Sequence, residues 1–290
     1  MDIIIPVHNG LRHFARCLAS LSQDISTIEK LIVVNDASNP AVDIYIRDSV
    51  ERWPDCEVVT NSRRLGFTHS VNLGISRSRS NFILLLNSDT FVPRGSLKVL
   101  ETFMQEEQGF GIVGPISNAA GFQSIPRFHR NFWERLSRQT VANPMPDEAL
   151  ASEMHNLVHE KNKKKALSVP WLSGFCMAIR REVIEEVGTL NQAAFPDGYG
   201  EEIDFCLRAR SAGWEVGLLP FAFVAHHVSG SYDPLHKFVL TSKGVKTNAR
   251  IHGAKKMTHD SRLAEQIVTD FWSEPRSVEI LASTRQLLAR

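Results

Sequence analysis

The stretch Phe82-Ile83-Leu84-Leu85-Leu86-Asn87-Ser88-Asp89-Thr90 decides how this chain is interpreted. Five consecutive apolar residues end abruptly in Asn-Ser-Asp. A run this short and this apolar, without helical spacing, is typical of a strand buried on both faces. Parallel strands in an open α/β sheet point their carboxyl ends at the ligand crevice. The pattern therefore predicts Asp89 at a strand end, where a carboxylate can meet a metal ion. A simple turn is the alternative, because Asn and Asp both favour turns.

Strand and helix patterns alternate along the first 115 residues. We expect strands over 2–7, 31–34, 57–60, 82–87 and 111–114, and helices over 11–21, 41–53, 68–79 and 97–104. Such alternation is typical of right-handed βαβ units. The predicted fold class is α/β, with a mostly parallel central sheet flanked by helices and a helical C-terminal tail.

The composition and net charge of the chain argue against some classes of function. The chain has 290 residues, 43% of them apolar, which fits one large globular domain with or without a tail. A net charge of +1 argues against a nucleic-acid binder with a general electrostatic footprint. The N-terminus shows no signal-peptide pattern, and no stretch approaches the length of a membrane span. The scattered cysteines, without Cys-x-x-Cys spacing, favour reduced thiols and a cytoplasmic location. They are Cys17, Cys56, Cys176 and Cys206.

A second informative block begins at Pro170. The apolar run 171–179 is interrupted by Gly174, where another backbone or a ligand can approach closely. A helix is predicted over 180–187, with Gly188 as its C-terminal cap. Three carboxylates then fall within four positions, at Glu201, Glu202 and Asp204.

These carboxylates repel one another, which raises at least one pKa unless a cation lies between them. Acidic residues in the first turn of a helix also compensate the helix dipole, and this alternative accounts for Glu201 and Glu202. The apolar residues that follow indicate a buried helix with an acidic start, which suits a catalytic position better.

His226 and His227 are adjacent, so in an extended segment they point to opposite sides and only one faces the crevice. His227 alternates in phase with Phe221 and Phe223, which would place it in the core. His226 alternates with a second apolar set, so periodicity does not decide between them.

The first half of the chain contains four motifs at predicted strand ends and loops: Ile4-Ile5-Pro6-Val7-His8-Asn9, Val33-Val34-Asn35-Asp36-Ala37-Ser38, Leu65-Gly66-Phe67 with Asn72-Leu73-Gly74, and Leu86-Asn87-Ser88-Asp89. Together they resemble the nucleotide-binding half of family 2 glycosyltransferases. The resemblance implies the A-type glycosyltransferase fold and makes the last motif its "DxD" metal site. Asn87 replaces the first Asp, so Asp89 would contact Mn²⁺ or Mg²⁺.

The same resemblance assigns roles to the donor site. Asp36 would accept a hydrogen bond from the base of a UDP- or dTDP-sugar, and His8 would lie near the base plane. A carboxylate only accepts, and uracil and thymine each offer one ring N–H. Both residues could instead be ordinary turn residues. The expected substrate-binding residues are Pro6, His8, Asn9, Asp36, Arg64, Gly66, Asn72, Asn87, Ser88, Gly174 and Glu201.

In the second half, the segment 200–208 with Ala212-Gly213-Trp214 resembles the acceptor-side acidic motif that supplies the general base. By position the base is Glu202, with Asp204 as the alternative. The segment 224–231 resembles the later histidine motif of the family. Its histidine precedes a Ser by five positions, as His226 precedes Ser231, so His226 is the expected metal ligand. A hydrogen-bonded core histidine is the alternative.

We expect one glycosyltransferase domain over 1–235, divided into a nucleotide-binding half (1–115) and an acceptor-binding half (116–235). The irregular region 122–168 could form a lid or an acceptor-facing insert. Its lysine run 161–165 is interpreted as a solvated face. The tail 236–290 carries ten basic and five acidic residues. It is either a solvated helical appendage or a surface that docks on the domain, a partner or an anionic membrane.

The predicted function is an inverting transfer of sugar from a UDP- or dTDP-linked donor to a saccharide or lipid-linked acceptor hydroxyl, in surface polysaccharide or glycolipid synthesis. Peripheral contact with the inner face of the membrane would run through the tail. A sugar nucleotidyltransferase shares the general fold, but His8-Asn9-Gly10 is a poor substitute for its Gly-rich, basic loop. A non-catalytic nucleotide-sugar-binding module would need a broken site, whereas Asp89, Glu202 and His226 are all present.

Overall fold

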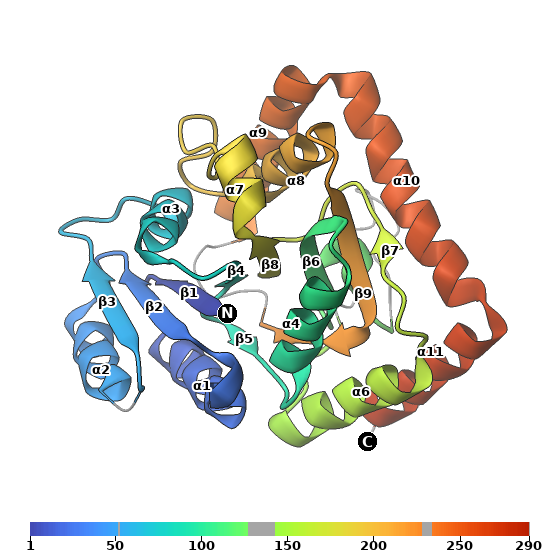
Figure 1. Cartoon of the computed structure of the whole chain (residues 1–290), viewed down its shortest axis with the longest axis horizontal. Helices are drawn as coiled ribbons and strands as arrows, with labels where there is room; N and C mark the ends of the chain where they lie inside the picture. The colour runs from blue at the N-terminus through green and yellow to red at the C-terminus, as the bar shows by residue number, and fades with distance from the viewer. Residues whose placement is uncertain (52, 127–142, 228–233, 290) are drawn as a thin grey trace.

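A central sheet of eight strands organises the computed structural model, which describes residues 1–51, 53–126, 143–227 and 234–289, with only the backbone for 234–236 (Figure 1). The strand order is β3-β2-β1-β4-β8-β6-β9-β7. The strands of this sheet are β1 (Asp2–Val7), β2 (Lys30–Asn35), β3 (Cys56–Thr60), β4 (Phe82–Leu86), β6 (Phe110–Ile116), β7 (Leu167–Ser168), β8 (Cys176–Arg180) and β9 (Glu215–Phe223).

The strands β3, β2, β1 and β4 run parallel, as do β6 and β9. The predicted mostly parallel sheet is therefore confirmed. Two short strands run the other way: β8 lies antiparallel between β4 and β6, and β7 pairs antiparallel with β9. Only the last part of the apolar run 171–179 forms a strand, because β8 begins at Cys176.

Helices connect the strands close to the predicted positions. The helix predicted over 41–53 runs instead from Pro40 to Val50, since Asn39 caps it by accepting from Val42 N and Pro suits the first turn. The helices are α1 (Leu11–Leu21), α2 (Pro40–Val50), α3 (Phe67–Arg77), α4 (Ser96–Glu106), α6 (Glu148–Lys161), α7 (Arg181–Val187), α8 (Glu201–Ser211), α9 (Pro234–His252), α10 (Ala254–Ser273) and α11 (Pro275–Leu288), with 3-10 turns η1 (Ser22–Thr27) and η2 (Gly121–Gln123).

The central strands bury both faces, as the apolar runs predicted. Alternate residues of β4 point to opposite sides: Leu85 joins a core formed with α3, α7 and α8, and Leu84 joins a core formed with α1, α2 and α4. Both leucines are at most 3% exposed. Burying each side chain of this kind contributes about 1.5–3 kcal/mol.

The sheet opens at the carboxyl ends of β1 and β4. The ladder between these strands ends at the pair Ile4–Leu85, and Pro6, two residues on, has no N–H to donate. Just beyond β4, a two-stranded antiparallel ribbon pairs β5 (Thr90–Phe91) with β10 (Ala225–His226). This ribbon brings residues 225–226 to the end of β4.

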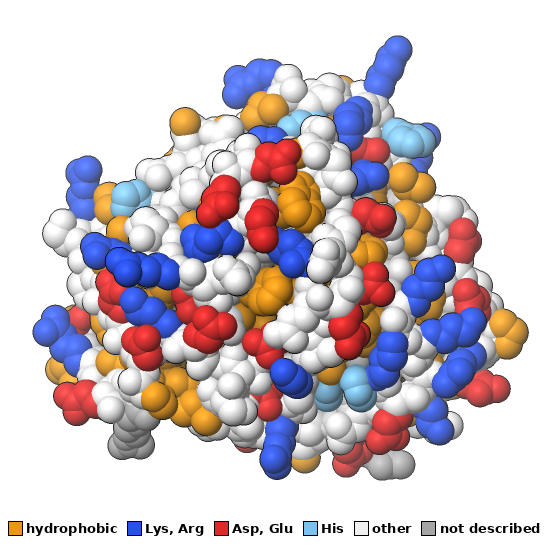
Figure 2. All heavy atoms as spheres, in the orientation of Figure 1, with side chains coloured by type: hydrophobic (Ala, Val, Ile, Leu, Met, Phe, Trp, Pro, Cys, Tyr) orange, Lys and Arg blue, Asp and Glu red, His pale blue; other side chains and the backbone are white. Residues whose placement is uncertain are grey.

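The C-terminal helices pack on elements of the segment 116–235. Contacts join α9 to α8, α10 to η2 and α11 to α6, and Figure 1 shows α10 running along the outer edge of the molecule. The proposed boundary at residue 235 stays a prediction. Among the described helices none is long and apolar enough to cross a bilayer. All four cysteines are free thiols. Acidic and basic side chains are interspersed over the face shown in Figure 2, in keeping with the net charge of +1.

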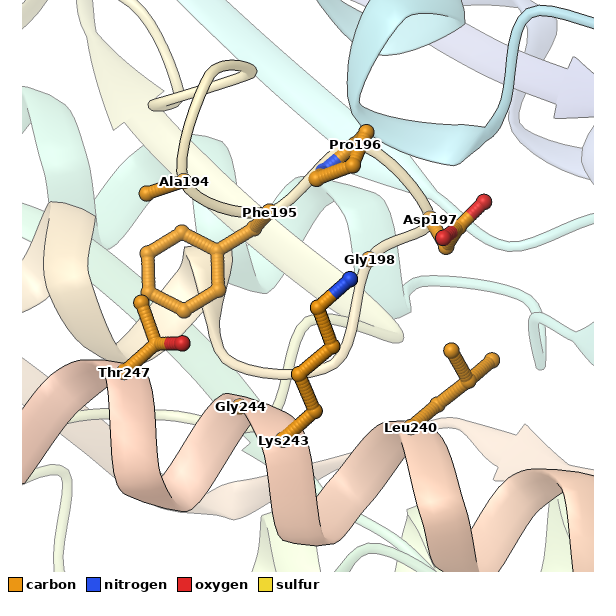
Figure 3. A pocket seen from close by; sticks show the side chains of 9 residues that line it. All are labelled: Ala194, Phe195, Pro196, Asp197, Gly198, Leu240, Lys243, Gly244 and Thr247. Atoms are coloured by element: carbon orange, nitrogen blue, oxygen red, sulfur yellow. The ribbon is translucent and has the colours of Figure 1, made fainter.

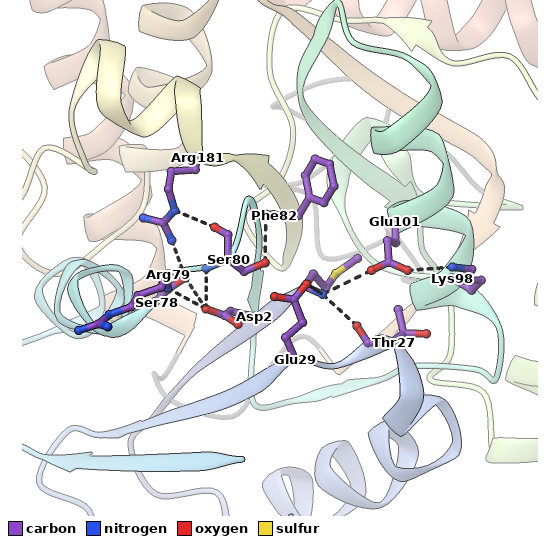
Figure 4. Close-up of polar contacts among 11 residues, drawn as sticks. Asp2, Thr27, Glu29, Ser78, Arg79, Ser80, Phe82, Lys98, Glu101 and Arg181 are labelled. Atoms are coloured by element: carbon purple, nitrogen blue, oxygen red, sulfur yellow. Dashed lines mark hydrogen bonds and ion pairs between the residues drawn. The ribbon is translucent and has the colours of Figure 1, made fainter. Parts of the chain in front are cut away.

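At the opposite end of β1, one carboxylate fixes the turn that leads into β4. Asp2 Oδ2 accepts hydrogen bonds from Ser78 Oγ (2.7 Å), Arg79 N (3.0 Å) and Ser80 N (3.1 Å) (Figure 4). Arg181 braces the same turn, because its guanidinium donates to Ser80 O and Ser78 Oγ. Asp2 therefore holds the entry to β4 in register with β1.

Replacing Asp2 by Ala should lower the free energy of unfolding by about 2–4 kcal/mol, because three donors at a largely buried site lose their acceptor. Urea denaturation of the wild type and the variant measures the change. Asp48→Ala, at an exposed position of α2, is the matched control and should change the stability by less than about 0.5 kcal/mol. Equal stability of all three proteins would show that Asp2 does not hold the turn.

Candidate active site

The end of β4 is fixed by backbone contacts. Asn87 N donates to Phe175 O (2.9 Å), and Thr90 Oγ1 donates to Asn87 O (2.9 Å). Asn87 Oδ1 is buried and has no hydrogen-bond partner among the described residues. A buried amide oxygen without a partner is costly unless a ligand completes it. Asp89 follows at the surface of this turn, with its side chain 21% exposed.

His226 is held beside Asp89 from three directions. The ribbon pairs it with Thr90, and the next residue donates its N–H to Asp89 O (2.9 Å). Asn118 brackets its backbone, accepting from His226 N (2.8 Å) and donating to His226 O (3.1 Å). The Phe175 ring stacks on the imidazole at 5.0 Å between centroids.

The two side chains face each other with acceptor atoms. His226 Nδ1 lies 2.9 Å from Ala119 O, and a carbonyl only accepts, so Nδ1 carries the proton in neutral imidazole. The lone pair of Nε2 then lies 3.4 Å from Asp89 Oδ1 and 3.5 Å from the amide donor Asn87 Nδ2. Two facing acceptors repel unless a proton or a cation lies between them. A metal-binding histidine has this arrangement, with its other nitrogen donating to a carbonyl.

This pair fits a divalent cation with few protein ligands. Carboxylate oxygen and imidazole nitrogen suit Mn²⁺, whereas imidazole is a poorer ligand for Mg²⁺. Within the described ranges, no three His, Cys, Asp or Glu side chains come together as a metal cluster. Asp89 and His226 would therefore leave most coordination positions to substrate oxygens and water.

His227 does not lie in the core, contrary to what its alternation with the phenylalanines indicated. It is half-buried, and its ring lies 4.1 Å from that of His13. Burial and the neighbouring His227 lower the pKa of His13, which also lies within electrostatic reach of Asp89. The sequence did not single out His13, because its position on α1 shows no local signal. The Ser231 end of the histidine motif lies outside the described residues.

Asp36 holds a loop in place. Its carboxylate accepts from Asn61 Nδ2 (2.9 Å), Leu65 N (2.7 Å) and Gly66 N (2.9 Å), and the residue is 4% exposed. A carboxylate has about four acceptor sites, so one remains. His8 Nδ1 contacts Asp36 O at 2.8 Å. The carboxyl ends of β1 and β2 therefore form one connected group.

Other expected donor-site residues have structural partners. Asn9 has a positive φ of 63° and accepts from Asn39 N, as a turn residue does. Asn72 donates to Leu190 O (2.8 Å) and accepts from Leu190 N (3.1 Å), so both ends of its amide serve to clamp α3 to the loop after α7. The expectation that Asn72 binds substrate finds no support in this geometry. Arg64 is exposed and Ser88 half-buried.

Gly66 brings the two halves together. A Cβ at this residue would lie 2.4 Å from Pro196 O, and its φ is +91°. Only glycine allows this approach. Thr68 Oγ1 adds a hydrogen bond of 2.5 Å to Phe195 O. The loop 195–198, which leads into the acidic motif, thus rests on the loop that Asp36 holds.

The acidic motif forms the first turn of helix α8. Glu201 is 4% exposed, and burial followed by the charge of Glu202 raises its pKa well above the ordinary value. Burial also raises the pKa of Glu202, which keeps a partly exposed side chain and accepts from Gly200 N through Oε2 (2.9 Å). The backbone of Gly174 lies against Glu202, since a Cβ there would be 3.3 Å from Glu202 Cβ. The next residue, Phe175, accepts the N–H of Asn87 at the end of β4. Glu202 and the end of β4 therefore contact the same loop, at neighbouring residues.

Asp204 is enclosed by Arg208 and His252. It is 1% exposed, and its oxygens contact Arg208 Nε and His252 Nε2, each at 2.9 Å. Arg208 also donates to Val187 O and Thr189 O. An acceptor hydroxyl cannot reach a carboxylate enclosed in this way, so the geometry favours Glu202 over Asp204 as the base.

Asn118 and His252 also shape the site, and sequence reasoning did not find either role. Asn118 lies 108 residues from His226, and His252 lies 48 residues from Asp204. Contacts at this separation leave no trace in local periodicity. Only the position of Asn118, directly after β6, was a signal, because polar residues at strand ends line the crevice of an α/β sheet.

Comparisons with known proteins agree with this geometry. The family model for glycosyl transferase family 2 matches residues 2–188. The chain is 24% identical over 261 residues to the N-acetylglucosaminyl-diphospho-decaprenol L-rhamnosyltransferase of Mycobacterium tuberculosis, covering 80% of this chain and 77% of that protein. It is 26% identical over 209 residues to the low-salt glycan biosynthesis hexosyltransferase Agl10 of Haloferax volcanii, covering 69% and 59% respectively.

The mannosyltransferase PcManGT from Pyrobaculum calidifontis, solved with GDP-Man and Mn²⁺, aligns with a TM-score of 0.61 at 13% identity, covering 100% of this chain and 80% of that chain. The likeness shows the fold, which is the A-type glycosyltransferase fold that the sequence predicted. The chain therefore belongs to family 2 of the glycosyltransferases, which act in glycan and polysaccharide biosynthesis.

Proposed function

We propose that this protein is a metal-dependent inverting glycosyltransferase that moves a sugar from a UDP- or dTDP-linked donor to an acceptor hydroxyl. One observation carries the proposal: Asp89 faces His226 at 3.4 Å on one side of the Gly174–Phe175 loop, and Glu202 lies on the other. This arrangement supports the proposal because the groups suited to a diphosphate leaving group and the group suited to an attacking hydroxyl contact the same loop.

The donor lies along the carboxyl ends of β1, β2 and β4. The base lies near His8, and its ring N–H donates to the remaining acceptor site of Asp36. Pro6, Asn9, Arg64 and Gly66 shape the surrounding loops. The diphosphate lies next to Asn87, Ser88 and Asp89. A Mn²⁺ or Mg²⁺ ion held by Asp89 and His226 would stabilise the negative charge that develops on the leaving diphosphate.

Glu202 acts as the general base. It takes the proton from the acceptor hydroxyl, whose oxygen forms the new bond to the anomeric carbon while the bond to the diphosphate breaks. Attack from the side opposite the leaving group inverts the anomeric centre, and no covalent enzyme intermediate is needed. Gly200 N–H fixes one oxygen of Glu202, and burial followed by the charge of Glu202 raises the pKa of the neighbouring Glu201. The loop at Gly174 positions the base against the donor.

The relatives support a glycan acceptor in surface polysaccharide or glycolipid synthesis. One is named for a diphospho-decaprenol substrate, a lipid-linked sugar, and another for glycan biosynthesis. A lipid-linked acceptor places the enzyme at the cytoplasmic face of a membrane.

The surface of α9 fits such a location. This helix contains four basic residues and no acidic one. Phe238, Val239 and Val245 are 43–55% exposed on it. Apolar side chains interleaved with lysine and arginine bind an anionic lipid surface through both burial and charge. We therefore include peripheral contact through α9 in the proposal.

The metal side of the site can be tested by thermal stabilisation. UDP-glucose, UDP-N-acetylglucosamine, dTDP-rhamnose and GDP-mannose are each added with Mn²⁺ or with EDTA. At 100 times the dissociation constant a true donor stabilises the fold by about 2.7 kcal/mol. Asp89→Asn and His226→Ala should lose the Mn²⁺-dependent part of this shift, and His227→Ala should keep most of it. A donor shift that survives in EDTA, or in both variants, would contradict the assigned metal ligands.

The base can be tested by kinetics. Glu202→Gln should bind the donor normally and lose about two to four orders of magnitude in rate. The wild-type rate should fall as the pH falls through a pKa above 4.5, because burial raises the pKa of Glu202 and the base works only when deprotonated. Asp204→Asn should lower the free energy of unfolding but keep the same fall of the rate at low pH. If Asp204→Asn abolishes this pH dependence and Glu202→Gln keeps it, the base has been misassigned.

The membrane contact can be tested by sedimentation with vesicles. The wild type should bind vesicles of phosphatidylglycerol and phosphatidylcholine at low salt, and release them at 0.5 M NaCl. Lys246→Ala should weaken binding about fivefold, since one lysine near an anionic surface contributes about 1 kcal/mol. Val245→Ser should weaken it further, whereas Val278→Ser on α11, with 50% exposure, is the matched control. Equal effects of the two valine changes would exclude α9 as the contact surface.

A further inference from the structure

The inner face of α9 touches the start of α8 directly. A Cβ at Gly244 would lie 1.6 Å from Tyr199 O, and a Cβ at Gly200 would lie 3.3 Å from Gly244 Cα. Two glycines, one on each segment, therefore allow the backbones to meet. Gly200 has a φ of +127°, which also requires glycine. The fit extends to the preceding loop, where the Phe195 ring points onto α9 beside Thr247 and lines a small pocket (Figure 3).

A hydrogen bond from α9 fixes the peptide that orients Glu202. Asn248 Nδ2 donates to Gly200 O at 2.9 Å, and Asn248 is fully buried. Gly200 N in turn donates to Glu202 Oε2 at 2.9 Å. The carbonyl of Gly200 also accepts from Asp204 N at 3.0 Å, as the first bond of the helix. Asn248 and Glu202 are thus connected through a single residue.

A second contact lies one turn further along α9. His252 Nε2 lies 2.9 Å from Asp204 Oδ1, and Arg208 holds the other oxygen. Positions 248 and 252 are four residues apart and share one face of the helix. Asp204 lies two residues after Glu202 in the first turn of α8. The first turn is therefore fixed from outside at two points.

We propose that Asn248 and His252 are positioning residues for catalysis, and that α9 completes the active site by setting the orientation of Glu202 through Gly200 and Asp204. The inference rests on the proposed role of Glu202 as the base. It assigns a function to a helix that the sequence left as an appendage or a docking surface. A carboxylate displaced by about 1 Å loses roughly a hundredfold in rate, so small movements of α8 are sufficient.

The test compares Asn248→Ala, His252→Ala and His252→Gln in the full-length protein. Turnover is followed as Mn²⁺-dependent release of nucleotide from the sugar nucleotide that stabilises the wild type most strongly. The two alanine variants should lose about ten- to a hundredfold in kcat. KM for the donor and the Kd for UDP with Mn²⁺ should stay within about twofold, because the donor lies at the other end of the Gly174 loop. His252→Gln keeps an N–H donor and should recover most of the rate.

Matched controls are Asn156→Ala on α6 and His259→Ala on α10, both exposed positions, which should leave the rate unchanged. Unchanged kcat in Asn248→Ala and His252→Ala would overturn the inference. A loss of kcat with an equal loss of UDP binding would also overturn it, because α9 would then support the whole fold rather than the base. Glu202→Gln is measured alongside. If Glu202→Gln keeps full activity, the proposed base fails, whereas a slow Glu202→Gln beside a fully active Asn248→Ala contradicts only the positioning role.

Discussion

The antiparallel pairing of β8 with β4 is the constraint on which the arrangement of the site depends. Cys176, the first residue of β8, pairs with Leu86, the last residue of β4. The loop that precedes β8 therefore arrives at the carboxyl end of β4, where Phe175 O receives the N–H of Asn87. A parallel strand in the same place would bring its carboxyl end to this edge, and the loop that precedes it would lie at the opposite edge. The reversed strand is what puts Gly174, and through it Glu202, beside the turn that contains Asp89.

Four carboxylates near this edge differ in chemistry because they differ in partners. Asp36 accepts from three N–H groups and stabilises a loop. Asp204 pairs with the guanidinium of Arg208 and contacts His252 Nε2, and without such partners a carboxylate buried to this degree would be very costly. Asp89 and Glu202 alone among the four keep partly exposed side chains. The carboxylates proposed to hold the metal and to act as the base are thus the two of these four that keep contact with solvent.

The sequence predicted the features of the fold and of the site that depend on residues close together in the chain. The apolar runs of β1, β2 and β4 located the strands, and the polar residues after them located the carboxyl edge where Asp36 and Asp89 lie, because both signals lie within a few neighbouring positions. The direction of β8 was not predictable from a Gly-interrupted run, since periodicity carries no information on strand direction. The contacts of Asn72 with Leu190 and of Asp204 with His252 were not predictable for a related reason: these partners lie 118 and 48 residues away. Family resemblance identified the motif positions but could not tell a side chain that meets substrate from one that braces the backbone.

The absence of acidic residues from α9 has a physical reason on each side of the helix. Its inner face lies against the first turn of α8, where Glu201, Glu202 and Asp204 already stand within four positions. A further carboxylate there would raise the pKa of Glu202 by repulsion, and it could not replace Asn248 as a donor to a carbonyl. Its outer face carries exposed apolar residues between lysines, where a negative charge would oppose an anionic membrane. The helix α9 can therefore connect the surface that would present a lipid-linked acceptor with the carboxylate proposed to activate it. The absence of acidic residues from α9 suits both the proposed membrane contact and the contact with α8.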